Sequence, residues 1–191
     1  MAAQSDPLDP GAMAPDFALP GVDGKAWTRD GCRGPNGLLV MFICNHCPYV
    51  RAVIDRIVRD ARDLAPLGIG IVAISANDPV AYPEDSFERM GEFARAHALP
   101  FPYLYDETQR IARAYGAVCT PEFFGYNARL ELQYRGRLDA SGRDPAPPGG
   151  RRRRRGDRAL LPARDGGGVE RGAPPRRLAG GRSPGGRGLG G

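Results

Sequence analysis

Two cysteines, Cys44 and Cys47, lie two residues apart where a run of apolar residues gives way to a helical pattern. Thiols at this spacing can close a small disulfide, because the second lies one helical turn beyond the first. The first turn of a helix offers unpaired N–H groups and the positive end of the helix dipole, and both stabilise a thiolate. We therefore expect the pKa of Cys44 to fall below its ordinary value of about 8.5, and the pair to take part in thiol–disulfide chemistry.

Two other kinds of site use the same Cys-x-x-Cys spacing. A structural zinc site needs four ligands, usually two close pairs, and c-type haem attachment needs a histidine directly after the second cysteine. Pro48 occupies that position. The remaining potential ligands are Cys32, Cys119, His46 and His97, which form no second pair. We therefore expect neither a metal nor a cofactor, and the alternative to redox chemistry is a pair of inert buried cysteines.

A buried strand and an amphipathic helix flank the two cysteines. Residues 38–43 are all apolar, which suits a strand that is buried on both faces of a sheet. Over residues 50–64 apolar side chains recur at three- and four-residue steps, which predicts an amphipathic helix that Pro66 and Gly68 end. A second apolar run at 69–75 completes a strand–helix–strand unit, which requires a parallel sheet with a right-handed crossover.

Shorter elements complete the predicted domain. Residues 14–20 and 26–28, joined by a turn at 22–25, indicate an N-terminal β-hairpin. The other predicted elements are a helix capped by Asp85 or Ser86 and reaching His97, a strand at 103–105, a helix from Asp106 to Tyr115, and a hairpin of strands 123–126 and 130–134. A parallel unit, a further helix and a closing antiparallel hairpin match the α/β thioredoxin fold.

Four stretches of the chain carry a resemblance to a known family. They are MFICNHCPYV, AISANDPVAYPEDSFERM, FPYLYDETQRIARAYGAVCTPEFF and YRGRLD. Together they are similar to the peroxiredoxin-like branch of the alkyl hydroperoxide reductase/thiol-specific antioxidant (redoxin) group, within the thioredoxin-like superfamily. The resemblance covers roughly residues 14–139. It implies a thioredoxin-like fold, with a central mixed sheet flanked by helices and an N-terminal β-hairpin.

The resemblance also implies which residues form the site. Cys44 and Cys47 would be the redox pair, and Pro121, after Thr120, matches the cis-proline that faces the pair in this fold. Its loop would offer backbone groups to a substrate chain. Cys119 lies two residues before Pro121, so it is a third candidate thiol, although a buried packing cysteine is the alternative. The reaction implied is the reduction of a disulfide or of a peroxide.

The chain departs from the family pattern at positions that handle peroxide and protons. Peroxiredoxins carry P-x-x-x-[ST]-x-x-C; with Cys47 aligned to the last position, Val40 replaces the proline and Cys44 the hydroxyl residue. The hydroxyl that orients peroxide is therefore missing. Thioredoxins carry a buried acid six residues before the first cysteine, where this chain has Leu38. Glu122, which follows the expected cis-proline, is a candidate proton acceptor in place of that acid.

The residues around the cysteines are expected to shape the site. Asn45 and His46 stand between the two cysteines where thioredoxin has Gly-Pro, and Pro48 follows them. A histidine next to the second cysteine resembles strongly oxidising disulfide exchangers. We therefore expect the reduction potential of the Cys44–Cys47 pair to be higher than that of thioredoxin, which is about −270 mV. His46 either stabilises the Cys44 thiolate electrostatically or is simply exposed at the site.

The 191 residues divide into three parts. Residues 1–13 form a loose lead-in, 14–140 form one thioredoxin-like domain, and 141–191 form a tail of Gly, Pro and Arg. This composition buries too little apolar area to become ordered, so the final helix of the fold is expected to be missing or replaced by a disordered tail. One hypothesis is that the tail is an out-of-frame translation of a GC-rich gene; the alternative is a polybasic arm.

Charge is segregated between the domain and the tail. Residues 1–140 contain 14 Lys and Arg against 18 Asp and Glu, whereas 141–191 contain 13 Arg against four acidic residues. The mildly acidic domain predicts no binding to nucleic acid or to an anionic membrane. Neither a secretory signal nor an apolar run of about 18 residues is visible, which favours the cytoplasm. In that reducing compartment, paired cysteines are more often catalytic than structural.

The sequence therefore predicts a cytoplasmic thiol–disulfide oxidoreductase. Cys44 would attack a protein or small-molecule disulfide, Cys47 would resolve the mixed disulfide, and a cellular thiol reductant would reset the pair. The first alternative is a peroxide reductase, in which one cysteine is oxidised to a sulfenic acid and condenses with the other. The second alternative is a non-catalytic redox-sensing or binding domain that keeps the fold.

Overall fold

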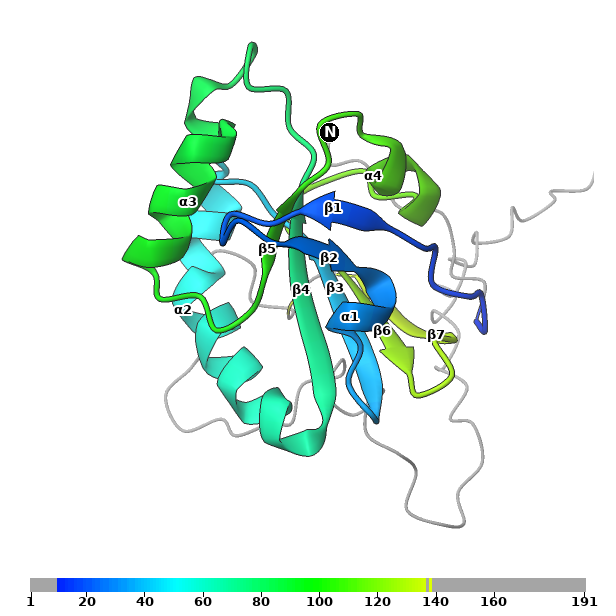
Figure 1. Cartoon of the computed structure of the whole chain (residues 1–191). Helices are drawn as coiled ribbons and strands as arrows, with labels where there is room; N and C mark the ends of the chain where they lie inside the picture. The colour runs from blue at the N-terminus through cyan, green and yellow to red at the C-terminus, as the bar shows by residue number, and fades with distance from the viewer. Residues whose placement is uncertain (1–9, 137, 139–191) are drawn as a thin grey trace, which may run out of the picture.

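The computed structural model describes residues 10–136 and 138. The elements follow one another as shown in Figure 1. They are β1 (Ala18–Pro20), β2 (Ala26–Thr28), α1 (Arg29–Cys32), β3 (Gly37–Phe42), α2 (Pro48–Leu64), η1 (Ala65–Leu67), β4 (Ile69–Ser75), η2 (Pro83–Asp85), α3 (Phe87–Ala96), β5 (Tyr103–Tyr105), α4 (Arg110–Tyr115), β6 (Glu122–Asn127) and β7 (Leu132–Gly136), where η denotes a 3₁₀ helix.

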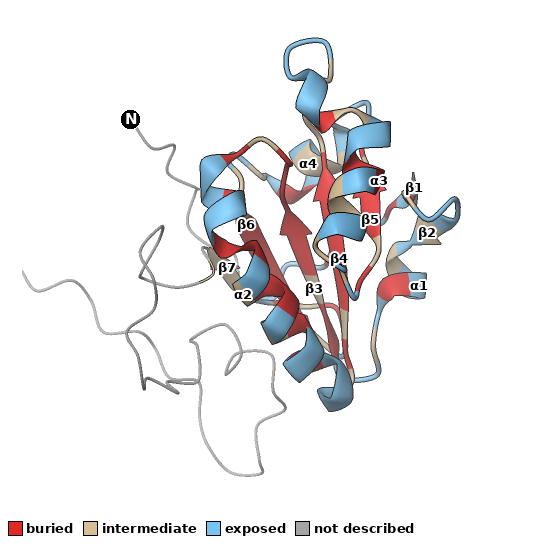
Figure 2. Cartoon of the chain, turned by 90° about the vertical axis from the view of Figure 1, so that its left-hand side faces the viewer, coloured by how far each residue is buried: buried red, intermediate tan, exposed pale blue. Residues whose placement is uncertain are grey.

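A mixed sheet forms the centre of the molecule. β4 pairs with β5 in parallel, whereas β3 pairs with β6, and β6 with β7, in antiparallel fashion. Figures 1 and 2 show β4 beside β3, and the N–H of Ile43 donates to the carbonyl of Ile74 over 3.0 Å. The central mixed sheet, the flanking helices and the N-terminal hairpin of β1 and β2 are confirmed.

Helices cover both faces of this sheet. α2 and α3 pack on one face, and the buried stripe of α2, which Figure 2 shows in red, follows from its three- and four-residue apolar spacing. On the other face Phe17, Cys32 and Tyr115 pack with Leu38, Val40 and other inner residues of the strands. Because β3 has apolar cover on both sides, it reads as a continuous apolar run rather than an alternating one.

Two predicted boundaries need correction. The helix expected from Asp106 begins only at Arg110, because Asp106 to Gln109 form a turn in which the Gln109 N–H donates to the Asp106 carbonyl. Asp106 still holds this helix, since its buried carboxylate accepts the N–H of Ala112 over 2.8 Å. In the helix expected to reach His97, Ser86 is the cap and accepts the N–H of Arg89, and His97 lies just beyond the last turn.

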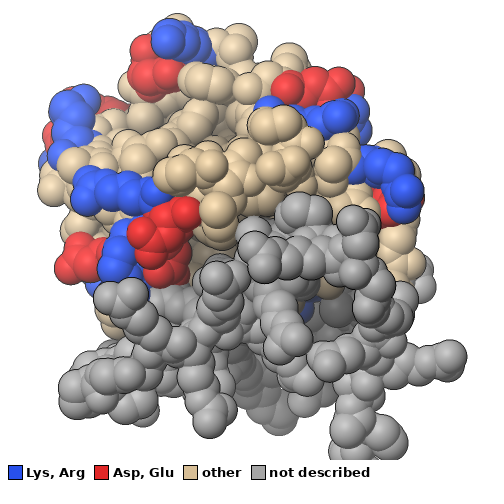
Figure 3. Space-filling model, turned by 90° about the horizontal axis from the view of Figure 1, so that it is seen from below, with Lys and Arg blue, Asp and Glu red and all other residues tan. Residues whose placement is uncertain are grey.

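The predictions for the two ends of the chain fall largely outside the described residues. These are residues 1–9 of the lead-in predicted over 1–13, the tail over 141–191, and the absence of a final helix. Residues 11–13 of that lead-in are not loose, because Gly11 donates to the carbonyl of Leu132 and Ala12 accepts the N–H of Leu132. Within the described part, none of the helices is long and apolar enough to cross a membrane. On the face seen in Figure 3, Lys and Arg side chains lie beside Asp and Glu side chains over the described residues.

Candidate active site

The two cysteines lie where the central strand passes into the long helix. β3 ends at Phe42, Cys44 follows two residues later, and Cys47 is the N-cap residue of α2. Pro48 occupies the first turn of α2, where its missing N–H costs no hydrogen bond. The arrangement predicted from the sequence, in which a buried strand delivers a Cys-x-x-Cys motif to the start of a helix, is confirmed.

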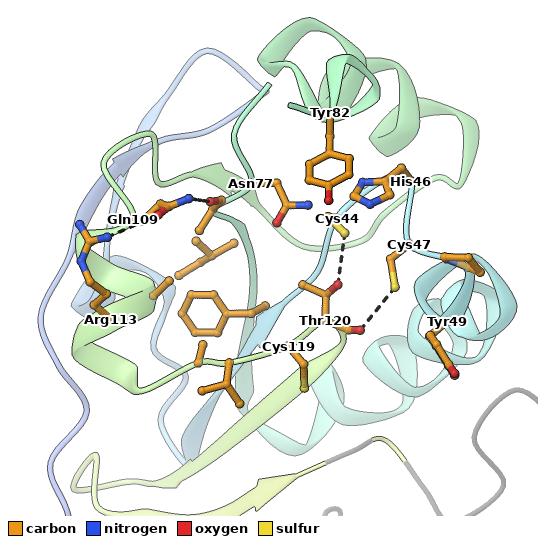
Figure 4. A pocket seen from close by; sticks show the side chains of 17 residues that line it. Cys44, His46, Cys47, Tyr49, Asn77, Tyr82, Gln109, Arg113, Cys119 and Thr120 are labelled. Atoms are coloured by element: carbon orange, nitrogen blue, oxygen red, sulfur yellow. Dashed lines mark hydrogen bonds between the residues drawn. The ribbon is translucent and has the colours of Figure 1, made fainter. Parts of the chain in front are cut away.

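Both sulfurs contact Thr120. Cys44 and Cys47 are free thiols with only 1% and 8% of their surfaces exposed. Cys44 Sγ lies 3.2 Å from the Thr120 hydroxyl, and Cys47 Sγ donates to the Thr120 carbonyl over 3.4 Å. The expected cis peptide bond between Thr120 and Pro121 is present. Figure 4 shows both contacts as dashed lines on the same side of the cavity.

The expected direction of the pKa of Cys44 is wrong. The hydrogen bond with Cys47, followed by burial, raises the pKa of Cys44. The same hydrogen bond lowers the pKa of Cys47 to about 5, with help from the Thr120 hydroxyl and the N–H groups of Val50 and Tyr49 and against the effect of burial. The physical reason is position. Cys47, not Cys44, stands at the helix N-terminus, whereas Cys44 lies before it in the protein interior.

A buried carboxylate that the sequence analysis treated only as a helix cap holds the Cys-x-x-Cys loop. Asp85 is completely buried, and its Oδ1 accepts the backbone N–H groups of Asn45 (2.7 Å) and His46 (3.1 Å). Its Oδ2 accepts His46 Nδ1 (2.5 Å) and Asn77 Nδ2 (2.7 Å). A usable signal existed, because Asp85 lies on the loop after β4, at the sheet edge where such loops gather.

The two residues between the cysteines are fixed by different contacts. The buried side chain of Asn45 donates to the carbonyl of Glu84 (2.8 Å) and accepts the hydroxyl of Tyr103 (3.1 Å). The half-exposed ring of His46 stacks on Tyr82, with centroids 4.3 Å apart and planes 5° from parallel. Asn45 therefore anchors the loop, whereas the His46 ring faces the site beside Cys44, as Figure 4 shows.

Glu122 does not have the surroundings expected of a proton acceptor. It is 2% exposed, and its Oε1 accepts Arg135 Nε over 2.9 Å. Its Oε2 accepts the N–H of Val118 over 2.9 Å. Because an arginine is always charged in proteins, this pair is a fixed ion pair that holds the loop before Pro121.

A cavity of about 530 Å³ opens beside the two thiols. Its lining is mainly apolar, with polar side chains from Asn77, Gln109 and Arg113 (Figure 4). Cys119 lines the same cavity and is exposed, so it is not the buried packing cysteine of the alternative prediction. By contrast Cys32 is buried on the other face of the sheet, where desolvation raises its pKa to about 12.

One group of potential metal ligands exists within residues 10–136 and 138. Cys44, His46 and Asp85 each place a ligand-type atom within 4.8 Å of the others. Both oxygens of Asp85 already accept two N–H groups, and one of these is the His46 ring. The contacts describe a hydrogen-bonded network around the thiols rather than a set of ligands that point at one ion.

Comparison with known proteins finds a family that this chain matches over most of its described residues. The model of the AhpC/TSA family matches residues 10–141. A protein of Mycobacterium tuberculosis named "Putative peroxiredoxin Rv2521" is 26% identical over 118 residues, which are 62% of this chain and 70% of that protein. The family contains peroxide- and thiol-dependent oxidoreductases.

Solved structures support the same fold. The crystal structure of an uncharacterized conserved protein from Geobacillus kaustophilus superposes with a TM-score of 0.73 and 44% identity, over 76% of this chain and 78% of that one. A thiol:disulfide interchange protein of the thioredoxin family from Chlorobium tepidum superposes with a TM-score of 0.56 and 20% identity, over 65% and 84%. The second likeness concerns the fold alone, and it confirms the predicted thioredoxin-like architecture.

Proposed function

The chain belongs to the AhpC/TSA family, and from this premise we propose that it is a thiol–disulfide oxidoreductase whose reacting groups are Cys44 and Cys47. The observation that carries the proposal is the placement of two reduced thiols at the start of α2, both in contact with Thr120 beside a cis-proline. A helix N-terminus and a lowered pKa are the conditions under which a cysteine is a nucleophile at neutral pH.

We assign the attacking role to Cys47 and the resolving role to Cys44, the reverse of the sequence-based expectation. The Cys47 thiolate attacks one sulfur of a substrate disulfide, which breaks the substrate S–S bond and forms a mixed disulfide. The other substrate half leaves as a thiolate and takes up a proton. Cys47 suits this step because its pKa is the lower of the two and it is the more exposed residue.

The second step closes the internal disulfide. Cys44 loses its proton and attacks the Cys47 sulfur, which forms the Cys44–Cys47 bond and releases the remaining substrate half as a thiol. In total, the substrate disulfide gains two electrons, which the cysteine pair loses, and two protons, of which Cys44 supplies one and the solvent the other. A cellular thiol reductant then restores the dithiol. A cytoplasmic location, where such reductants keep thiols reduced, fits this cycle.

A stoichiometric assay tests the function and both roles. Reduced protein that carries Cys119→Ser, so that this exposed thiol does not interfere, is mixed with an aromatic disulfide whose released thiol is coloured. We expect two coloured thiols per chain, the first from attack and the second from resolution. Cys44→Ser should release one and remain as a mixed disulfide, which mass spectrometry detects. Cys47→Ser should react slowly. Trapping on Cys44 in the Cys47→Ser variant would reinstate the sequence-based roles.

A second candidate function is peroxide reduction. The observation that favours it is the low pKa of Cys47, since a peroxide would oxidise this thiolate to a sulfenic acid and Cys44 would then condense with it, releasing water. Against it, Cys44 stands at the position where peroxiredoxins carry a hydroxyl residue. Consumption of hydrogen peroxide by the reduced protein, compared with Cys47→Ser, decides between the two. A chain with neither activity and no reversible couple would be a binding or sensing domain.

A further inference from the structure

The resolving step needs a proton acceptor for Cys44, which the two cysteines do not provide. Cys44 has to lose a proton before it can attack, yet it is almost completely buried, and its hydrogen bonds within the described residues go to the Thr120 hydroxyl and to Cys47, neither of which is cationic. The position of the buried acid in thioredoxins is Leu38, which lies on the opposite face of the sheet. Glu122 is held in its ion pair with Arg135. A base for Cys44 therefore has to come from the other side of the site.

His46 and Asp85 have the geometry of such a base. A carboxylate that accepts N–H groups on both oxygens has no proton to give, so the contact of 2.5 Å has His46 Nδ1–H donating to Asp85 Oδ2. In the neutral ring this leaves Nε2 with a lone pair. The stack on Tyr82 fixes the plane of the ring. Cys44 Sγ, a His46 nitrogen and an Asp85 oxygen all lie within 4.8 Å of one another.

We propose that His46 is the proton acceptor for Cys44 in the resolving step and that Asp85 is the positioning residue that orients its ring. The inference rests on the proposed function. The imidazole takes the proton of Cys44 as the thiolate attacks Cys47, and the imidazolium is paired with the Asp85 carboxylate while it exists. The departing substrate thiolate then removes this proton, so that His46 returns to its neutral form and protons balance over the step.

The Asp85 carboxylate positions both the backbone of the Cys-x-x-Cys loop and the ring of His46. Asp85 Oδ1 fixes the backbone of Asn45 and His46, and Oδ2 fixes the ring, so one buried group sets both the path of the Cys-x-x-Cys loop and the direction of the base. Asn77 donates to the same oxygen and completes the set. The charged and titratable groups around His46 are Asp85, Tyr82 and Cys44, together with Arg51, whose Nε donates to the adjacent Asn45 carbonyl.

The experiment separates the release of the first coloured thiol from that of the second in a single turnover, in the Cys119→Ser protein. The variant is His46→Asn, because the amide of asparagine can still donate to Asp85 but cannot exchange a proton. We expect the first release to change little and the second to slow by about 100-fold, the lower end of what a general base contributes. The pH dependence of the second release should become that of the Cys44 thiol alone, and added imidazole should restore part of the rate.

Asp85→Asn tests the positioning role, and Asp106→Asn is its matched control. Asp106 is also a buried aspartate that accepts a backbone N–H, but it lines a different cavity from the cysteines. We expect Asp85→Asn to slow the second release and to change its pH profile, and Asp106→Asn to alter only stability. A second release in His46→Asn with the rate and pH profile of the parent protein would overturn the inference. A parent that releases fewer than two thiols would instead refute the proposed function.

Discussion

Two buried carboxylates hold the two loops that meet at the cysteines, and they differ in their partners. Asp85 fixes the Cys-x-x-Cys loop and bonds to a histidine, whereas Glu122 fixes the loop before the cis-proline and bonds to Arg135. Both are almost completely excluded from water. An imidazole can gain and lose a proton near neutral pH, but a guanidinium cannot. The comparison teaches that burial alone does not make a carboxylate part of a proton path; the titratable partner does.

The largest effect is expected from Glu122→Gln. It leaves Arg135, whose side chain is 13% exposed, without its negative partner, and removing one member of a buried pair costs about 3–5 kcal/mol. Urea unfolding measures this loss. If Glu122 lies outside the proton path, the folded fraction of the Glu122→Gln protein should still release two coloured thiols. Glu131→Gln, which removes a carboxylate from an exposed pair with Arg129, is the control and should change stability little. A Glu122→Gln protein that folds normally but does not release the second coloured thiol would show that Glu122, rather than His46, is the proton acceptor for Cys44.

A smaller loss of stability is expected from Asp85→Asn. Its carboxylate accepts four N–H groups, and we expect a loss of about 2 kcal/mol, the scale of a hydrogen bond to a charged group. This variant should therefore be more stable than Glu122→Gln and yet release the second coloured thiol more slowly. If the two variants lose stability and resolution in equal proportion, both carboxylates are structural and the distinction between them fails.

The sequence was sufficient for the fold and for the position of the cysteines. The unbroken apolar run of β3, the periodic face of α2 and the Cys-x-x-Cys between them are local patterns, and local patterns survive in the structure. The cis bond before Pro121 followed from the resemblance. What failed is the direction of the pKa of Cys44, because α2 starts directly after Cys47, three residues beyond Cys44, so that Cys47 rather than Cys44 stands at its N-terminus.

The role of Asp85 was missed for a different reason, although its place after β4 at the edge of the sheet was a usable signal. Nearly forty residues separate it from the cysteines, and its neighbours in sequence make it a credible helix cap. Only the return of the chain through β4 brings the loop after that strand against the start of α2. Glu122 is the opposite case. It is close to the site in sequence, but its side chain is turned toward Arg135 of β7, a partner that pattern reasoning does not assign.

The stability of the reduced protein should depend on pH in a way that distinguishes the two sulfurs. The lowered pKa of Cys47 means that the unfolded chain binds one more proton than the folded chain between about pH 5 and about pH 9, so stability rises with pH across that window. The slope is at most about 1.4 kcal/mol per pH unit. Above pH 9 the raised pKa of Cys44 reverses the sign. Urea unfolding of the reduced protein at several pH values measures this, and Cys47→Ser should lack the rise.

The smallest effect is expected at Thr120, which lies on the loop that Glu122 holds and contacts both sulfurs. Its hydroxyl lowers the pKa of both Cys44 and Cys47, so Thr120→Val should raise the pKa of Cys47 and weaken its reactivity toward an alkylating reagent near neutral pH. One hydrogen bond sets the scale at about 1 kcal/mol. Thr120→Ser, which keeps the hydroxyl, is the control. Neither variant removes the contact between Cys47 and the carbonyl of Thr120, because that carbonyl belongs to the backbone. A loss of reactivity in both variants would therefore mean that the position of the loop, rather than the hydroxyl, controls the reactivity of the Cys47 thiolate.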